Sequence, residues 1–201
     1  MKKDLLLKQL ADNGYNVIYG GKKHFSTFDI VEKMPGRIAF FTLTIGILQI
    51  YKPNFPYNSE ISLLLILASI MALTISQYNG DKKRYEEVGN RLIQIHNELR
   101  EIYYQVQSSE NENYSKESNE IKRMNELVAE YYRISIPKQI IFSDWLAHYK
   151  LFVQNNYDWL DKQKDFKWMD KIPLSFIIAV VVVVVLVIVI VIYFKNGGII
   201  C

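Results

Sequence analysis

The longest hydrophobic run of the chain lies near its C-terminal end, where residues 172–194 carry no charge and are flanked by Lys171 and Lys195. At about 1.5 Å per helical residue, a run of this length crosses the roughly 30 Å hydrocarbon layer of a bilayer. In lipid, an isolated apolar segment satisfies its own backbone hydrogen bonds only as a helix. We therefore predict a transmembrane helix at 172–194, followed by an external tail at 195–201.

Two shorter hydrophobic runs, 38–51 and 61–76, lie close together in the N-terminal half. Each is short for a bilayer span, so a buried helix of a soluble protein is a competing interpretation. The connector between them holds Pro53 and Pro56, which stop a helix and leave a tight turn between antiparallel neighbours. The pattern predicts a transmembrane hairpin at 37–78, with its helices at about 37–52 and 58–78.

Basic residues lie on one side of all three runs. They precede the first, follow the second and precede the third, whereas the hairpin connector holds only Lys52. Loops on the cytoplasmic side of a membrane are enriched in lysine and arginine. We therefore expect a multi-pass membrane protein with three spans, its N-terminus cytoplasmic and its C-terminus outside. The N-terminal segment 1–36 and the helical region 79–171 would both be cytoplasmic.

Small and polar residues form a stripe on one face of each hairpin helix. The stripe consists of Thr42, Gly46 and Gln49 on the first helix and of Ser62, Ser69, Ala72 and Ser76 on the second. Such stripes allow close helix packing in lipid. In an oligomer they would also be able to line a water-filled path. The last run holds no polar side chain between positions 176 and 192, so we expect an anchor or a lipid-facing wall there.

A heptad repeat follows the hairpin directly. Its apolar positions, which we call the heptad seam, are Tyr85, Val88, Leu92, Ile95, Leu99, Ile102 and Val106. The spacings of three and four residues continue over about three heptads, which is the lower limit for a coiled coil. A coiled coil between copies and an intramolecular bundle explain this pattern equally well. The chain is thus predicted to be an all-α membrane protein with an N-terminal hairpin, a cytoplasmic bundle or coiled coil, and a C-terminal span.

The remaining cytoplasmic residues predict further helices. Residues 108–120 hold no aliphatic side chain and predict a polar, mobile link. Helices are expected at about 118–135 and 138–155, followed by an interfacial segment at 157–171 that is rich in lysine and tryptophan. The predicted apolar faces of the two helices are Ile121, Met124, Val128 and Tyr131, and Phe142, Trp145, Tyr149 and Phe152. At the N-terminus we expect a short leucine-rich helix that Gly20 and Gly21 interrupt.

Signals for catalysis are missing from the sequence. His24, His96 and His148 stand far apart, with no carboxylate at ligand spacing, so we predict no metal site. Gly21 and Lys22 resemble the end of a phosphate-binding loop, but Lys23 replaces the hydroxyl residue that would bind magnesium. The net charge of +3 is too small to indicate nucleic-acid binding. We expect neither enzymatic activity nor a cofactor.

One family resemblance rests on the hairpin and the helix that follows it. The stretch FSTFDIVEKMPGRIAFFTLTIGILQIYKPNFPYNSEISLLLILASIMALTISQYNGDKKRYEEVGNRLIQIHNELREIYYQV and the later segment RMNELVAEYYRI carry it. From residue 25 to about residue 155, the chain resembles the SLATT domain, whose name abbreviates SMODS and SLOG-associating two-transmembrane effector. The chain departs from this pattern by adding a third predicted span.

The resemblance implies a bacterial anti-phage defence effector. Such a protein would oligomerise in the inner membrane and form a pore or disrupt the membrane, causing growth arrest or cell death. The implied partners are the lipid bilayer, further copies of the chain, and a partner protein that makes or senses a nucleotide signal. The alternative is a non-conducting membrane scaffold or immunity protein, which would use its cytoplasmic helices to recruit a soluble partner.

Overall fold

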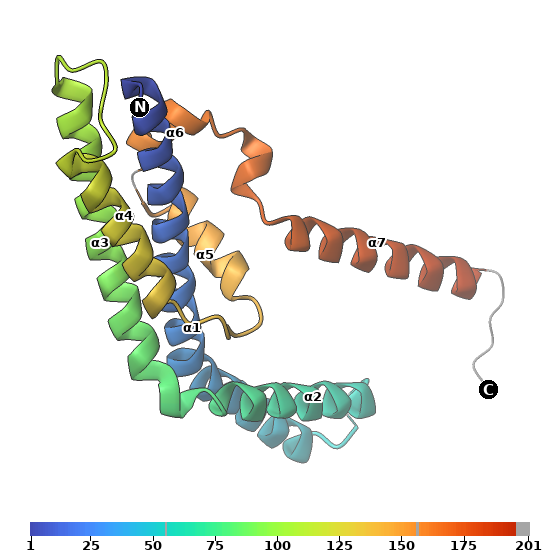
Figure 1. Cartoon of the computed structure of the whole chain (residues 1–201). Coiled ribbons are helices and arrows are strands. Elements are labelled where there is room, and N and C mark those ends of the chain that lie inside the picture. Colours follow the sequence, from blue (N-terminus) through green and yellow to red (C-terminus); the bar gives the residue numbers. More distant parts are fainter. Residues whose placement is uncertain (55, 156, 196–201) are drawn as a thin grey trace. The chain divides into compact units, whose positions relative to one another are not determined.

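The structure is a computed structural model that describes residues 1–54, 56–155 and 157–195, and these are almost entirely helical (Figure 1). The helices are α1 Lys3–Tyr51, α2 Asn58–Ser76, α3 Lys82–Ser108, α4 Asn119–Ile134, α5 Ser143–Phe152, α6 Asp158–Lys164 and α7 Leu174–Lys195, with 3-10 turns at Asn79–Asp81 and Trp168–Lys171. No β-strand occurs among these residues. The prediction of an all-α chain is confirmed.

The first helix is much longer than expected, because α1 runs without a break through Gly20 and Gly21. Those glycines do not interrupt the helix, so that prediction is wrong. A Cβ added at Gly20 would lie 3.0 Å from the ring of Tyr131, and one added at Gly21 would lie 3.3 Å from the side chains of Leu92 and Ile93. The glycines therefore serve packing: they let α3 and α4 approach α1 closely, at a cost of about 1 kcal/mol each in helix propensity.

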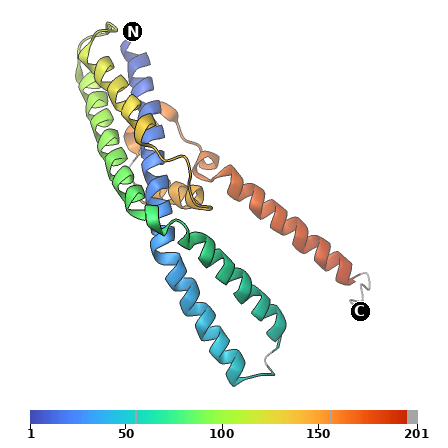
Figure 2. The same ribbon diagram turned by 60° about the horizontal axis from the view of Figure 1, so that its bottom comes forward.

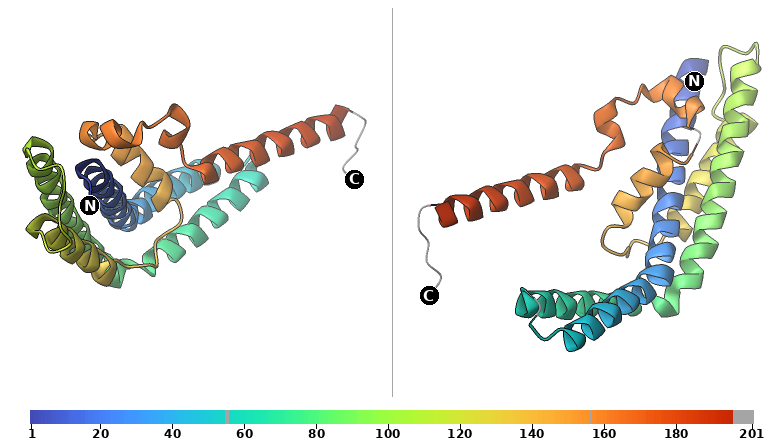
Figure 3. Two further views of the ribbon diagram at one scale, coloured as in Figure 1. Left: turned by 45° about the horizontal axis from the view of Figure 1, so that its top comes forward. Right: turned by 180° about the vertical axis from the view of Figure 1, so that it is seen from behind.

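Both helices that enter the hairpin change direction at its base. Figures 1 and 3 show α1 bending between its N-terminal half and its apolar half, and α2 turning sharply into α3. Pro35 lies inside α1 at this transition, and a proline removes one backbone hydrogen bond and kinks a helix. The turn between α2 and α3 is the 3-10 segment Asn79–Asp81. The hairpin is thus joined to the bundle by two bends at the same level.

The heptad seam packs inside the chain. All of its members except the half-buried Val88 are buried, and α3 packs chiefly along α1. The partners on the other helix include Leu6, Leu10, Val17 and Ile18, which are also buried. Of the two interpretations of the repeat, the single chain therefore realises the intramolecular bundle.

The polar link after α3 is fixed to the start of the chain. The N–H of Tyr114 donates to the carbonyl of Met1 at 2.8 Å, and the N–H of Lys3 donates to the carbonyl of Glu112 at 3.0 Å. Tyr114 itself is buried. The expected mobility of this segment conflicts with these contacts, because one aromatic side chain and two backbone bonds are enough to hold a polar loop to its neighbour.

Helix α4 agrees with its prediction to within a residue at each end, but Leu127 is buried where Val128 was expected. Helix α5 is shorter than predicted, and its buried face is different. Ser143, Ala147 and Leu151 are buried against the bundle, whereas the predicted aromatic face has Phe142 and Tyr149 exposed and Trp145 and Phe152 half-buried. Small side chains allow α5 to lie close to α1, which wide aromatic rings would prevent.

The segment predicted to be interfacial begins instead with a bundle helix. In α6, Trp159 is only 2% exposed, and the ring lies against Gly14, where an added Cβ would be 2.4 Å from Trp159 Cη2. The prediction is therefore wrong for this tryptophan. Its signal in the sequence was ambiguous, since tryptophan is common both in cores and at membrane interfaces.

The described residues from Asp165 to Lys195 belong to a second unit. Its turn Trp168–Lys171 is capped by the N–H of Lys167, which donates to Asp170 Oδ2 at 2.9 Å. Helix α7 follows and exposes valine and isoleucine side chains over its described length. The predicted external tail at 195–201 lies outside the described residues except for Lys195, which ends α7.

Candidate functional site

The hairpin of α1 and α2 exposes apolar side chains around most of its circumference. Figure 2 shows the two helices side by side. In the most apolar window of α1 no residue is buried, and in that of the stretch Asn58–Ser108 only 6% are. Side chains such as Phe40, Leu43 and Leu64 are more than half exposed. The core helix of a soluble protein would be covered, so this surface fits lipid far better than water.

Gln49 closes the hairpin at its connector. Its Nε2 donates to Asn58 Oδ1 at 2.7 Å, to the carbonyl of Asn58 at 3.0 Å and to Ser62 Oγ at 3.2 Å. These groups join the end of α1 to the start of α2. An amide in an apolar environment needs such partners, and Gln49 finds them within its own chain.

The other stripe residues divide into two sets. Thr42, Gly46 and Ala72 are half-buried, whereas Ser69 and Ser76 are exposed. The hydroxyls of the two serines donate to the carbonyls of Leu65 and Ala72 in their own helix. A Cβ added at Gly46 would meet no atom within 4 Å. The hairpin therefore leaves a smooth strip at Ser69 and Ser76 that a second helix would be able to approach.

A small apolar cluster couples the hairpin base to the loop before α5. Val31, Ile75 and Ile140 are buried together, with Met34, Ile38 and Tyr78 packed around them. The ammonium of Lys138 lies 4.8 Å from the centre of the Tyr78 ring, and Lys82 pairs with Glu32 across the bend. The loop 135–142 contacts both hairpin helices, so a movement of the hairpin would also displace this loop.

Two buried histidines hold segments of the bundle together. His24 Nδ1 lies 2.7 Å from the carbonyl of Gly20, and His24 Nε2 accepts from the N–H of Ile136 at 3.0 Å. His96 Nδ1 lies 3.0 Å from the carbonyl of Gly14. Both arrangements use the neutral ring with Nδ1 protonated. Burial lowers the pKa of His24 and lowers that of His96 to about 4. These two histidines have a structural role in joining segments of the bundle, and the sequence analysis did not predict it.

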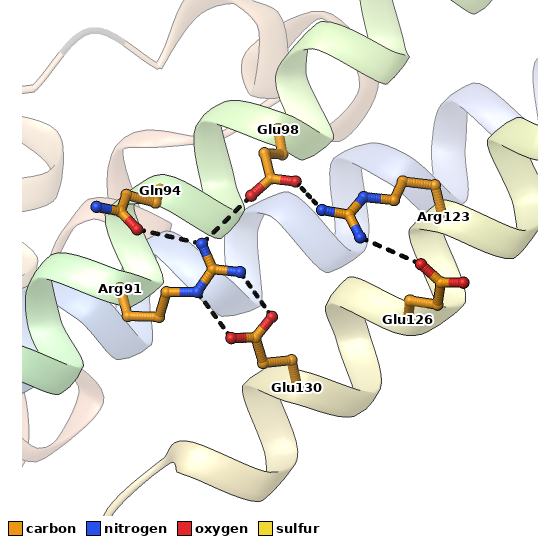
Figure 4. Close-up of polar contacts among 6 residues, drawn as sticks. All are labelled: Arg91, Gln94, Glu98, Arg123, Glu126 and Glu130. Atoms are coloured by element: carbon orange, nitrogen blue, oxygen red, sulfur yellow. Dashed lines mark hydrogen bonds and ion pairs between the residues drawn. The ribbon is translucent and has the colours of Figure 1, made fainter.

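Charged residues tie α3 to α4 on the outside of the bundle (Figure 4). The Arg91 guanidinium donates two hydrogen bonds of 2.7 Å to the Glu130 carboxylate, and its Nη1 lies 3.4 Å from Glu98 Oε1. Arg123 bridges Glu98 and Glu126. Bidentate geometry favours this network, yet its members are partly exposed, so each pair contributes on the order of 1 kcal/mol or less. This charged network aligns α3 with α4, whereas the buried apolar side chains supply most of the stability of the contact.

A polar pocket of about 390 Å³ lies between α1 and α3. Its polar lining consists of amide, imidazole and cationic groups and includes no carboxylate, and its lining residues are Ile18, Lys22, Phe25, Asn90, Ile93, His96, Asn97, Arg100 and Asn155. Burial and the nearby charge of Lys150 lower the pKa of Lys22. Two cations without a carboxylate beside them favour an anion in this pocket.

No cluster of three metal-ligating side chains occurs among the described residues.

A family model described as SMODS and SLOG-associating 2TM effector domain 6 matches residues 1–180. The chain belongs to the SLATT family. The match begins at the N-terminus and so includes all of α1, which the sequence resemblance covered only from residue 25. No curated protein and no solved structure matches the chain. SLATT membership implies a membrane effector associated with defence.

Proposed function

We propose that this SLATT protein oligomerises in the bacterial inner membrane and forms a pore or disrupts the membrane when a defence signal arrives. The observation that carries the proposal is the uncovered apolar hairpin, which is attached at two bends to a well-packed helical bundle. Such a protein can place two helices in lipid and control them from the bundle. Its effect would be growth arrest or cell death.

The bends at the base of the hairpin are the proposed moving parts. A signal that shifts the bundle would change the angle at which α1 and α2 enter the membrane, through the cluster of Val31, Ile75 and Ile140. The exposed strip at Ser69 and Ser76 would then pack against, or line water with, further copies. At roughly 2.3 kcal/mol per elementary charge per 100 mV, the membrane potential itself drives ions through any hydrated opening.

We place reception of an anionic signal at the polar pocket between α1 and α3. A nucleotide messenger carries phosphate groups, and Lys22 and Arg100 supply the complementary charge. The pocket touches both long helices of the bundle, so an occupant would bias their spacing. A partner protein docking on the bundle would reach the same helices.

For topology we propose three spans, the third formed by α7, which holds the apolar stretch Leu174–Val189. The N-terminus would be cytoplasmic and the C-terminus outside. Reporter fusions test this orientation. Alkaline phosphatase fused after residue 201 should be active and green fluorescent protein dark there, with the opposite result before residue 1. Phosphatase inactive at both ends would contradict the third span.

The effector role is tested by expression in bacteria with a potential-sensitive dye, alone and together with the neighbouring genes. We expect depolarisation and growth arrest under at least one trigger. Ser69→Leu should abolish depolarisation, because a large side chain fills the exposed strip, whereas Ser69→Ala keeps the strip open and should retain most of it. Gln49→Leu should instead weaken the hairpin turn, since Asn58 and Ser62 lose their donor.

The matched control is Leu64→Ile, which changes an exposed apolar side chain without changing polarity. It should behave like the parent protein. Unchanged membrane polarisation under every trigger, at expression levels confirmed in the membrane fraction, would contradict the effector role. A stable complex with a soluble partner and no conductance in reconstituted bilayers would favour the scaffold alternative.

A further inference from the structure

The outward face of α5 forms an apolar groove with the base of the hairpin. The groove has a volume of about 670 Å³, and its lining includes Ile30 and Met34 of α1, Ile70 and Met71 of α2, and Trp145 and Leu146 of α5. Almost all of its lining surface is apolar, and the hydroxyls of Thr74 and Tyr149 are the polar groups of its lining side chains apart from the indole N–H of Trp145. We call it the α5 groove.

One wall of the α5 groove belongs to the membrane part of the hairpin. Ile70 and Met71 lie on α2 well before its end at Ser76, and both are about half exposed. At about 1.5 Å per residue, Ile70 lies roughly 9 Å below the end of the helix. If α2 is embedded in lipid, the groove opens into the hydrocarbon layer at one end and reaches the cytoplasmic bundle at the other. It is continuous with the exposed apolar surface of the hairpin.

The residues at the rim have the character of a membrane interface. Ile141 is 68% exposed and Phe142 is 44% exposed, and Phe142 adopts φ 66°, a conformation uncommon for a bulky side chain. The rings of Phe142 and Trp145 lie 4.7 Å apart between centroids. Aromatic side chains settle at the level of the lipid headgroups. Phe142 and Trp145 were predicted to share one apolar face, and the exposure of Phe142 has an explanation if it meets lipid.

Basic side chains near the groove complete a site for an anionic headgroup. Lys138 precedes the buried Ile140 by two positions, and its ammonium lies over the Tyr78 ring at the hairpin base. Arg37 is exposed on α1, one turn beyond Met34. Neither forms an ion pair within the described ranges of the chain. A phosphate at this level would be attracted to both, while carboxylates nearby, Asp29 and Glu32, are already paired with lysines.

We propose that the α5 groove binds one anionic phospholipid of the cytoplasmic leaflet, with an acyl chain along the groove and its phosphate near Lys138 and Arg37. The inference rests on the placement of the hairpin in the membrane and requires neither a pore nor a signal. The bundle would then be fixed to the membrane surface through α5 as well as through the hairpin. Loss of that lipid would free the loop 135–142 that touches both hairpin helices.

The test uses the full chain in nanodiscs of phosphatidylglycerol and phosphatidylcholine, released into the gas phase for native mass spectrometry. We expect one retained phospholipid per chain, with phosphatidylglycerol preferred. Lys138→Gln should reduce that preference about fivefold, as expected for one basic residue near an anionic surface. Lys116→Gln, in the polar link, is the matched control and should leave it unchanged. Ile70→Trp fills the groove and should remove the retained lipid.

A second measurement remains informative even if the groove-filling variant Ile70→Trp fails to fold. In a Trp168→Phe background, bilayers of chain-brominated phospholipid should quench the fluorescence of Trp145, and Trp145→Phe should remove the quenched component. Trp159 is buried in the bundle and serves as the unquenched reference. No retained lipid together with no quenching would overturn the proposal. Loss of a dimer in Ile70→Trp with unchanged lipid content would also overturn it, in favour of a second copy. A chain that retains lipid but never depolarises cells would contradict the effector role and would leave the lipid site of the α5 groove standing.

Discussion

Truncation of Leu99 to alanine is expected to lower the free energy of unfolding of the bundle by roughly 2–5 kcal/mol. Leu99 is fully buried in the heptad seam, at the centre of the contact between α3 and α1 of the same chain. Removing its isobutyl group leaves a cavity that rigid helices fill only in part. The loss is large compared with the total stability of an ordinary domain, about 5–15 kcal/mol.

The measurement is urea unfolding in detergent micelles, followed by circular dichroism over a wide range of protein concentration. Because the seam is intramolecular, the loss for Leu99→Ala should not depend on concentration. Tyr104→Ala, at an exposed position of the same helix, is the control and should change stability by much less. A loss that vanishes on dilution would instead assign the seam to contacts between copies.

The elements that sequence reasoning placed correctly are those with a strong period or a strong hydrophobic excess. The hairpin helices and α4 follow from apolar runs and regular spacing, and their ends lie close to prolines or polar links. The heptad spacing located α3 correctly. It left the partner of the seam open, because the same periodic face fits a helix of its own chain and a helix of another copy.

The errors share a physical cause, which is close packing. Gly14, Gly20 and Gly21 were counted as breakers or overlooked, although each of them admits a large side chain of a neighbouring element. Conversely, the aromatic spacing in α5 predicted one apolar face, but the residues that the helix buries are Ser143, Ala147 and Leu151. Hydrophobic periodicity shows that a face avoids water, but it does not distinguish a protein core from a lipid surface. The structure resolves this ambiguity, because it shows that α5 packs on the bundle through small residues such as Ser143 and Ala147.

The polar stripe illustrates what spacing alone leaves undetermined. Gln49 and Ser62 were singled out as members of two stripes, one on each hairpin helix, and the structure brings them into one hydrogen-bonded cluster with Asn58. Ser69, seven residues further along, is exposed. A step of seven residues turns an ideal helix by only about 20°, so Ser62 and Ser69 share a face, but only Ser62 lies at the connector, where Gln49 reaches it.

Stability of the bundle is expected to fall steeply as pH decreases from about 6.5 to 4, chiefly because His96 resists protonation. The folded pKa of about 4 lies below the unfolded value of 6.5, so between these limits the unfolded chain binds a proton that the folded chain does not. The corresponding stabilisation at neutral pH is roughly 3 kcal/mol, and it is lost as pH falls through this window. Burial also lowers the pKa of His24, which acts in the same direction.

Urea unfolding at a series of pH values checks this expectation, with His96→Asn as the diagnostic variant. Asparagine can still donate to the carbonyl of Gly14 but cannot titrate, so its stability should vary less between pH 6.5 and 4.5 than that of the parent. His148→Gln replaces a less buried histidine and should keep most of the slope. An equal slope in His96→Asn and the parent would show that His96 is not the group responsible. Since the ring of His96 packs against Trp159 and lines the polar pocket, the same acid range should also loosen α6 and the proposed signal site.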